Sequence, residues 1–441
     1  MKFSMVTTFF GGHSFGGDAA YVDRLSQALC RRGHEVHVYY CVDSFNAVRG
    51  NHPLREYTPP EGLHLHPLES GYGMLSPLAT QATGQPLFKS RILREALEDP
   101  TTDVIHFHNV SLVGGPGLLA MGRKTNAARI MTAHEHWLIC PMHLLWKYDR
   151  KPCDGPSCVR CSLAGGRPPQ AWRYTGAIRR GLRQLDALLF PSTHALDEHR
   201  KRGIGKDVPL VHFPYFLPDE WSRGIEDEER ATSGRPYLAA AGRLVAMKGF
   251  QRLIPLMRYL PEVDLRIAGT GPYEETLKLL AAGLPNVHFE GLLGGAKLAR
   301  LFRSARAVVV PSLFPETFGY VVLEAFAVGT PVVVHEGGGA LLETGVLSGG
   351  GLGYRSDGEM LLAMRRVVHD EALRSELAAR GYARRIGEWS EGDHIHRYFE
   401  LIRRLRGGSR DAAVYRPHGA GVGAAGPRRV PAGWDIKERA N

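Results

Sequence analysis

The 441-residue sequence contains no run of about 20 apolar residues, the length that a membrane-spanning helix needs. Its start, MKFSMVTTFFGG, has one lysine and a short apolar stretch but no small-residue cleavage site, which predicts a first β-strand rather than a signal peptide. No short-period repeat indicates a solenoid. These absences favour a globular cytoplasmic protein, and the chain length predicts two domains and a tail.

Two motifs of metal and cofactor chemistry are missing as well. No Asp-x-Asp pair is present, so we expect no divalent metal at the catalytic site. The glycine turn IAGTGPYEE lacks the G-x-G-x-x-G spacing of dinucleotide-binding turns, because Pro272, Tyr273 and Glu274 follow its second glycine. The sequence therefore predicts chemistry without a bound catalytic cofactor.

Acidic residues are outnumbered, with 45 Asp and Glu against 55 Lys and Arg, a formal net charge of +10. Such an excess favours anionic partners such as phosphates, acidic lipid surfaces or nucleic acid. Part of it lies in residues 407–441, whose composition predicts disorder. A nucleic-acid-binding protein should gather its arginines in one continuous stripe, which this sequence does not show, so we expect no nucleic-acid partner.

One basic stretch could still contact a membrane. The segment WRYTGAIRRGLRQLDALLF carries four arginines beside apolar positions, namely Arg173, Arg179, Arg180 and Arg183. A basic amphipathic face can lie on a membrane surface that holds a lipid-linked acceptor. A solvated helix face is the favoured interpretation, and a peripheral contact with the inner membrane face is the alternative.

Short apolar strands alternate with helical stretches in two successive series, which is typical of parallel α/β sheets. The first series places strands at 2–10, 35–41, 103–109, 129–135 and 187–193, with a helix at 16–34. A linker rich in proline and charge follows at 212–230, and strands then recur at 235–244, 264–271, 286–291, 307–312 and 331–339. We expect two doubly wound domains that face each other across a cleft, with ligands at the carboxyl ends of the strands.

The strongest local signal is PSLFPETFGYVVLEAFAVGTPVVV. Glu316 follows a strand, and Glu324 lies eight positions on, inside the next helix. Between them the helix entrance at 317–319 offers free backbone N–H groups and a positive dipole end, which favour an anion such as a diphosphate. Gly319 lets the backbone approach a ligand closely. Two solvated or capping glutamates are the alternative, because acidic residues are common at helix starts.

This segment resembles the glutamate–seven residues–glutamate motif of retaining glycosyltransferases of the GT-B fold, family four. AGRLVAMKGF resembles the arginine and lysine loop of that family, IAGTGPYEETL its glycine turn, and NVHFEGLL its base-contacting strand end. FFGGHSFGGDAAYVDRLSQALCRRGHEVHVY resembles its N-terminal glycine loop and helix. The matches follow the family's order and span nearly the whole chain except the tail and a cysteine-rich segment.

The resemblance implies a GT-B architecture of two Rossmann-like domains. The N-terminal acceptor domain would span 1–214, with a cysteine-rich insertion at 138–165. The nucleotide-sugar donor domain would span 215–390, followed by a crossover helix at 391–406 and the tail. Where relatives often have an asparagine-glycine linker turn, this chain has FPYFLP, which would alter how the domains close.

The resemblance also implies roles for individual residues. Arg243 and Lys248 would neutralise the donor diphosphate as it leaves. Glu324 would hold the ribose, and Glu316 would hold the transferred sugar. The phosphate cradle would include Phe318, Gly319 and Tyr320 and, across the cleft, Gly16 and Gly17. Surface solvation of the two cations and plain turns at the glycines are the alternatives.

His134, in MTAHEHW, stands where the family often places a histidine near the donor sugar. We place it in the catalytic set with Glu316, Arg243 and Lys248, without assigning it as a base, and its competitors are His106, His108 and His136. No residue is an obvious nucleophile for a double displacement. The resemblance favours front-face transfer, in which the leaving phosphate helps to take the acceptor's proton and catalysis is mostly electrostatic.

Four of the six cysteines lie close together in WLICPMHLLWKYDRKPCDGPSCVRCSL, namely Cys140, Cys153, Cys158 and Cys161. Four thiols at this spacing, the last two in C-x-x-C, could hold a tetrahedral structural zinc. A disulfide is disfavoured in a cytoplasmic protein. A loop without metal and an iron–sulfur cluster are the alternatives.

Taken together, the residues and the resemblance predict a retaining glycosyltransferase that moves a sugar from a nucleotide-diphosphate donor onto an acceptor. The nucleobase, the sugar and the acceptor stay open, and polysaccharide, lipid-linked and natural-product acceptors are all compatible. The competing hypotheses are a non-catalytic nucleotide-binding relative and a basic protein that binds nucleic acid or acidic surfaces around a structural zinc.

Overall fold

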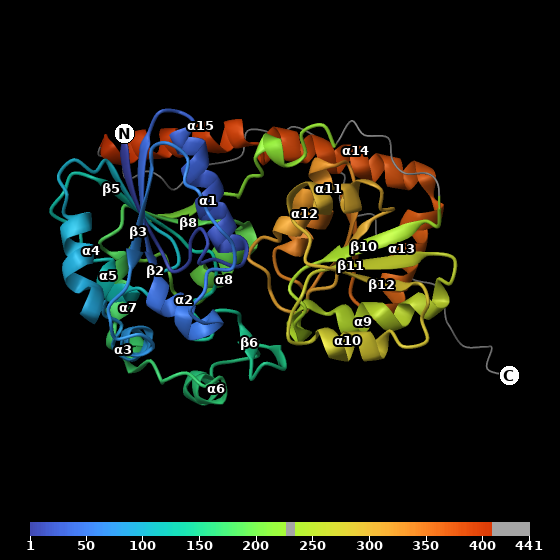
Figure 1. The fold of residues 1–441 in the computed structure, drawn as a ribbon, viewed down its shortest axis with the longest axis horizontal. Coiled ribbons are helices and arrows are strands. Elements are labelled where there is room, and N and C mark those ends of the chain that lie inside the picture. The colour runs from blue at the N-terminus through green and yellow to red at the C-terminus, as the bar shows by residue number, and fades with distance from the viewer. Residues whose placement is uncertain (226–233, 408–441) are drawn as a thin grey trace.

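The computed structural model describes residues 1–225 and 234–407, which form two parallel sheets side by side (Figure 1). The first sheet has the strand order β3-β2-β1-β4-β5-β8-β9. Its strands are β1 (Lys2–Thr7), β2 (Glu35–Cys41), β3 (Leu63–Leu68), β4 (Val104–Phe107), β5 (Ala128–Thr132), β8 (Ala187–Phe190) and β9 (Leu210–His212). We call this sheet and its helices the first domain.

Helices cover this first sheet because their apolar residues recur on one side. In α1 (Gly17–Cys30) the side chains of Tyr21, Val22, Leu25 and Leu29 are fully buried, three or four positions apart. The other helices of the first domain are α2 (Val42–Arg49), α3 (Leu75–Thr83), α4 (Ser90–Leu97), α5 (Gly115–Leu118), α7 (Ala177–Leu182) and α8 (Thr193–Lys201).

The second domain is built on a six-stranded parallel sheet with the order β12-β11-β10-β13-β14-β15. The strands are β10 (Tyr237–Ala241), β11 (Asp264–Ala268), β12 (Val287–Gly291), β13 (Val308–Val310), β14 (Val332–His335) and β15 (Gly351–Tyr354). Strand β13 is buried along its whole length, as expected of a central parallel strand covered on both faces. The helices are α9 (Phe250–Leu253), α10 (Glu274–Leu280), α11 (Gly295–Arg303), α12 (Tyr320–Ala327), α13 (Asp357–His369) and α14 (Glu371–Glu388).

The expected α/β fold with two doubly wound domains is confirmed. The structure adds three strands to the two parallel sheets. Strand β2 occupies the predicted residues, and the predicted helix at 16–34 is α1. Strands β3, β9 and β15 were not expected. Strand β3 alternates leucine with histidine, and β15 reads GLGY, so neither shows the run of β-branched residues that marks a buried strand.

The cysteine-rich insertion forms a small subdomain of its own. It contains the antiparallel strands β6 (Trp146–Lys147) and β7 (Lys151–Pro152), followed by α6 (Cys158–Ala164). Figure 1 shows this unit outside the seven-stranded sheet, with β6 on the side that faces the second domain.

The last helix, α15 (Glu391–Arg406), returns to the first domain. The hydroxyl of Tyr398 lies 2.9 Å from Nδ1 of His106, and that of Tyr21 lies 3.1 Å from Nε2 of His394. Nδ1 of His394 lies 2.9 Å from the carbonyl oxygen of Pro214, which can only accept, so Nδ1 donates and Nε2 accepts from Tyr21. Only the first residue of the predicted disordered tail, Gly407, lies within the described residues.

The linker between the domains is buried rather than open. Phe213, Tyr215, Phe216 and Leu217 are all buried and pack in the same hydrophobic cluster as α1 and α15. The proline-rich segment FPYFLP therefore forms part of the core that joins the two domains. Residues 226–230 of the predicted linker lie outside the described residues.

Tyr398→Ala is expected to lower the free energy of unfolding by about 3–5 kcal/mol, because it removes a fully buried aromatic side chain. Tyr398→Phe keeps the ring and only leaves Nδ1 of His106 without a partner, which costs about 1–3 kcal/mol. Urea denaturation of both variants measures the difference. The control Arg404→Ala, on an exposed position of α15, should stay within about 0.5 kcal/mol of the wild type, and a loss as large as that of Tyr398→Ala would contradict the placement of this helix.

Candidate active site

The carboxyl ends of the two sheets meet at a seam between the domains, where α1 and α8 of the first domain face α12 of the second (Figure 1). Loops after β1, β5, β10 and β13 carry the predicted site residues to this seam. In parallel α/β sheets the carboxyl ends are where ligands bind, because backbone N–H groups and loop side chains converge there.

Glu316 and Lys248 lie together in the second domain. Nζ of Lys248 is 2.6 Å from Oε1 of Glu316, and the hydroxyl of Ser312 donates to the same oxygen at 2.7 Å. The Lys248 ammonium also lies 5.1 Å from the centre of the Phe314 ring. Backbone hydrogen bonds fix the loop that contains Glu316. The Glu316 N–H donates to the carbonyl oxygen of Gly338, and the Glu316 carbonyl oxygen accepts from the N–H of Ala340. The structure therefore brings the predicted residues Lys248 and Glu316 into direct contact.

Glu324 lies inside α12 and faces the first domain. Its Oε1 is 3.5 Å from Nη2 of Arg24, a residue of α1, and burial raises the pKa of the Glu324 carboxyl. The Arg24 guanidinium lies 4.6 Å from the centre of the Tyr320 ring. Arg24 was not predicted as a site residue, since nothing in the sequence distinguishes it from a solvated helix position.

The two helix starts at the seam each carry a glycine. Gly319 precedes α12 with φ 89°, a left-handed conformation that glycine adopts without strain, and Gly17 is the first residue of α1. A Cβ atom on Gly17 would lie 3.2 Å from Cδ2 of Tyr320. The positive dipole ends of α1 and α12 therefore point at one region. Gly16 precedes α1 with φ 94°. The Phe318 side chain is 2% exposed, and its ring centre lies 6.1 Å from that of Tyr320.

Arg243 and Arg49 bring two positive charges to this region, one from each domain. Loss of water around the guanidinium and the nearby charge of Arg49 lower the pKa of Arg243, while Asp149 and Asp18 oppose the shift. Within residues 1–225 and 234–407, neither arginine has an ion-pair partner. Two like charges near each other, with no carboxylate at ion-pair distance among the described residues, favour an anion between them.

His134 belongs to a buried chain of rings. Its Nε2 lies 2.9 Å from Nδ1 of His108, and its Nδ1 lies 2.5 Å from the hydroxyl of Tyr215. Burial lowers the pKa of His134 to about 3, so the ring is neutral near pH 7. The histidines that were alternatives to His134 have other contacts. His106 contacts α15, and Nε2 of His136 lies 3.2 Å from the carbonyl oxygen of Pro315. Because both ring nitrogens of His134 are occupied, the ring is not available as a base in this state.

Two carboxyl groups of the first domain were missed by sequence reasoning. Asp18 follows the glycine loop and accepts from Nδ2 of Asn109 at 3.2 Å. Burial, followed by the nearby charge of Glu135, raises the pKa of Asp18 from 3.8 to about 6. Glu135 itself lies 2.7 Å from Nδ1 of His143. An aspartate in the first turn of a helix looks like an ordinary capping residue, so no sequence pattern distinguishes Asp18 as a site residue.

Hydrogen bonds hold the seam together. The hydroxyl of Thr317 donates to the carbonyl oxygen of His134 at 2.7 Å. The hydroxyl of Ser192 donates to the carbonyl oxygen of Thr317, also at 2.7 Å. Glu343, from the π-helical segment Leu342–Leu347 of the second domain, accepts from the backbone N–H groups of Thr193 and His194. The second domain thus supplies a carboxylate to the amino end of α8, where a negative charge is favourable.

The basic stretch does not form one continuous face. Arg173 is partly buried between the rings of Trp137 and Trp172, while Arg179 and Arg183 both pair with Asp207. Its exposed charge is therefore smaller than the sequence suggests.

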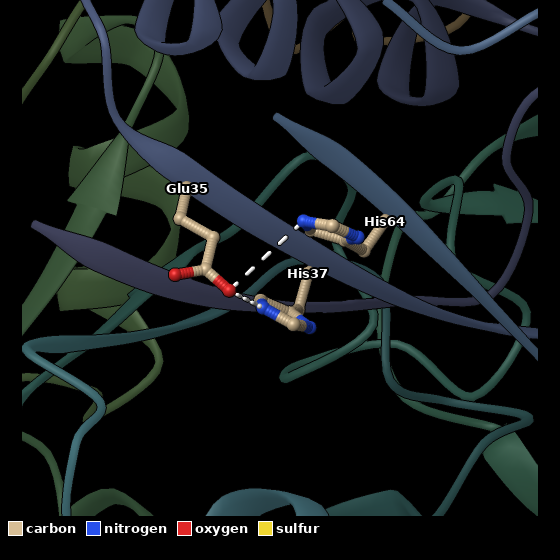
Figure 2. Close-up of side chains that lie close together, drawn as sticks. All are labelled: Glu35, His37 and His64. Carbon is tan, nitrogen blue, oxygen red and sulfur yellow. Dashed lines mark hydrogen bonds and ion pairs between the residues drawn. The ribbon is translucent and has the colours of Figure 1, made fainter. Parts of the chain in front are cut away.

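One further cluster of titratable groups lies away from the seam (Figure 2). Oε1 of Glu35 is 2.7 Å from Nε2 of His37 and 3.9 Å from Nε2 of His64. These residues lie near the amino ends of β2 and β3, whereas the predicted site lies at the carboxyl ends. The Glu35 cluster is thus not part of the candidate active site.

The architecture and the site define a class. Two parallel sheets with facing carboxyl ends, and cations and helix starts gathered at their seam, are the features of a two-domain α/β protein that binds a nucleotide diphosphate. Comparison with known proteins supports this class. Residues 15–213 match the model of Glycosyltransferase Family 4, and residues 223–384 match that of Glycosyl transferases group 1.

Individual relatives agree with these matches. The D-inositol 3-phosphate glycosyltransferase of Arthrobacter sp. (strain FB24) is 36% identical over 393 residues, which cover 84% of this chain and 85% of that protein. The sulfoquinovosyl transferase SQD2 of Arabidopsis thaliana is 35% identical over 134 residues, 27% of this chain and 26% of that protein, so the match spans about a quarter of its length. The chain belongs to the family 4, group 1 glycosyltransferases, as the sequence predicted.

The solved structures confirm the GT-B fold. A sucrose-phosphate synthase from Thermosynechococcus elongatus superposes with a TM-score of 0.67 at 19% identity, over 92% of this chain and 100% of that one. Among residues 1–225 and 234–407, no helix is both long and apolar enough to cross a membrane.

The raised pKa of Asp18 predicts a specific pH dependence. The folded protein holds the Asp18 proton with a pKa of about 6, whereas the ordinary value is 3.8, so the unfolded chain releases the proton first as pH rises. Folding stability contributed by this group therefore falls between pH 3.8 and about 6. Thermal unfolding of wild type and Asp18→Asn should show the variant gaining relative stability across this window. A difference that is independent of pH would contradict the enclosure of Asp18.

Proposed function

We propose that this protein transfers a sugar from a nucleoside-diphosphate donor to an acceptor hydroxyl with retention of anomeric configuration. The observation that carries the proposal is the meeting of two helix starts, at Gly17 and Tyr320, with the guanidinium of Arg243 close enough to interact electrostatically with Asp18 at the start of α1. A diphosphate at this point would receive backbone N–H groups and positive charge from both domains.

The donor side of the mechanism is mainly electrostatic. Arg243 and Lys248 neutralise the diphosphate as negative charge grows on the leaving oxygen, and Arg49 adds a third cation from the first domain. Lys248 keeps Glu316 in place through their 2.6 Å contact. Glu316 has a second carboxylate oxygen with which to accept from hydroxyl groups of the sugar. These cations replace a divalent metal in our proposal.

Glu324 is assigned to the ribose. Its contact with Arg24 is 3.5 Å long and uses only one of the carboxylate oxygens. A carboxylate can accept about four hydrogen bonds, so two ribose hydroxyls can bind while Arg24 stays nearby. Stacking of the Arg24 guanidinium on Tyr320 keeps that cation at the edge of the site.

The bond changes in our proposal take place on one face of the sugar. The bond between the anomeric carbon and the leaving phosphate oxygen breaks, and the acceptor oxygen forms its bond to the same face. The acceptor's proton passes to an oxygen of the departing diphosphate. Neutral His134, with both ring nitrogens occupied, positions the loop through its carbonyl bond to Thr317 rather than taking a proton.

The acceptor side is assigned to the first domain. Asp18 and Glu135 are carboxyl groups that influence each other electrostatically near the start of α1, where they can orient acceptor hydroxyls. The Arthrobacter relative is named for a phosphorylated inositol. Cytoplasmic location, a peripheral membrane contact of the basic stretch and the lack of a nucleic-acid partner stay predictions.

Donor binding is tested by thermal shift and calorimetry with UDP, GDP, TDP and ADP. One nucleotide should stabilise the wild type, and Arg243→Ala and Glu324→Ala should each weaken its binding by about 10- to 150-fold, the loss expected for one charge-assisted hydrogen bond. Arg258→Ala, on an exposed helix turn of the same domain, is the control and should bind like the wild type. Equal binding by all three variants would overturn the donor site.

Stereochemistry is tested once a donor and an acceptor that support turnover are found. Proton NMR of the first product formed should show the anomeric configuration of the donor sugar, because departure and attack share one face. Inverted product would refute the proposed front-face transfer while leaving the donor site intact.

A further inference from the structure

The four clustered cysteines come from three parts of the insertion and surround one cavity. Cys140 lies in the turn before β6, Cys153 follows β7, and Cys158 and Cys161 lie in the first turn of α6. All four line a cavity of about 20 Å³, and all are free thiols. Residues three positions apart on a helix share a face, so Cys158 and Cys161 point to the same side.

The fold brings these thiols together through a chain of local bonds. The N–H of Cys153 donates to the carbonyl oxygen of Leu145 at 2.7 Å, and the N–H of Cys161 donates to the carbonyl oxygen of Ser157 at 2.9 Å. Asp154 pairs with Lys147 and with Lys151, which ties the turn after β7 to the hairpin. The convergence of the cysteines is therefore a product of the whole insertion and not of one flexible loop.

We infer that Cys140, Cys153, Cys158 and Cys161 bind one structural zinc ion, and that this ion fixes the insertion against the donor loops of the second domain. Four thiolates are a complete tetrahedral set for zinc and leave no open position for catalysis. The cavity has room for a single ion.

A partly buried cation next to the thiols fits such a centre. Zinc bound by four thiolates carries a net negative charge, and the guanidinium of Arg173 interacts electrostatically with Cys140 and Cys158. Its Nη2 is buried without a hydrogen-bond partner in the described structure. An N–H group in this position can donate to a zinc-bound sulfur, the kind of outer contact that stabilises metal sites.

The backbone beside the cavity is strained. Four non-glycine residues in this short segment have positive φ, between 50° and 73°, namely His143, Leu145, Tyr148 and Asp149. Each such conformation is unfavourable for a residue with a Cβ atom and persists only where surrounding interactions enforce it. The insertion has little hydrophobic core of its own, so a metal is a suitable source of that constraint.

The second part of the inference concerns what the zinc holds in place. Trp146, on β6, is buried in a cluster with Met247 and Phe314 of the second domain. Met247 precedes Lys248, and Phe314 lies two positions before Glu316, so Trp146 packs on the loops that carry both residues. This part rests on the proposed function, because those loops hold the donor.

Figure 2 shows a second group of residues that could hold a metal ion. Glu35, His37 and His64 bring ligand atoms within 4.8 Å of one another, closer than the thiols, which metal binding would draw inward. However, Nε2 of His37 is engaged by Glu35 and its Nδ1 lies 2.9 Å from His66, while about half of the Glu35 and His64 side chains is exposed. Thiolates are also the stronger zinc ligands.

The first experiment measures metal in the full-length protein. After expression with zinc, elemental analysis should find one zinc per chain in the wild type, in Cys30→Ser and in His64→Ala. The double variant Cys158→Ser/Cys161→Ser should lose it. Replacement by Co²⁺ in the wild type should give the absorption of a tetrahedral thiolate site, which does not depend on whether the double variant folds.

Three outcomes would overturn the metal assignment: no zinc in the wild type, zinc lost in His64→Ala but kept in the double variant, or labile sulfide and iron in place of zinc. The coupling to the donor loops is tested separately. Trp146→Ala should keep its zinc but weaken nucleotide binding by about 10- to 100-fold, since small displacements of positioning groups have effects of this size. Wild-type nucleotide affinity in Trp146→Ala would refute the coupling alone, and absence of nucleotide binding in the wild type would refute the proposed function alone.

Discussion

The close approach of α1 and α12 is the constraint on which the rest of the site depends. Two positive helix ends repel each other unless an anion or carboxylates lie between them, and a Cβ atom at position 17 would lie 3.2 Å from the Tyr320 ring, tighter than an ordinary contact. Asp18 and Glu324 bring carboxyl groups to the two helices, and Arg24 of the first domain lies 3.5 Å from Glu324 of the second. In our proposal, the helix ends and the nearby guanidinium of Arg243 hold the donor diphosphate.

Two kinds of contact hold the seam together. The buried aromatic residues of the linker and α15 join the domains through apolar packing, with Tyr215 and Phe318 in edge contact at 4.9 Å. Hydrogen bonds lie beside this packing, such as that from Thr317 to the carbonyl oxygen of His134, whose ring contacts the Tyr215 hydroxyl. Apolar packing resists separation over its whole area, whereas isolated hydrogen bonds exchange readily with water. The apolar contacts therefore contribute most to holding the two domains together.

Much of the fold could be predicted from the sequence, because buried parallel strands are nearly continuous apolar runs. Strand β2 was placed at its observed residues, whereas β15 was missed because its glycines pack closely against the neighbouring strand and carry no apolar signal. In the site, Glu316, Lys248 and Arg243 were located through an ordered set of motifs. Arg24, Arg49 and Asp18 were not, since their significance comes from contacts across the seam that no local pattern encodes. Their functional roles stay predictions.

The return of α15 to the first domain has a consequence for how the chain is made. His394, Tyr398 and Ile402 are core residues of that domain, yet they are synthesised after the whole of the second domain. While the ribosome is still translating, the surface formed by Tyr21, His106 and Phe3 lacks its cover. Domains generally fold as they emerge, amino-terminal first. Here Phe3 and Tyr21 stay uncovered until α15 has been synthesised, so a nascent chain exposes apolar surface that chaperones can recognise throughout the synthesis of the second domain.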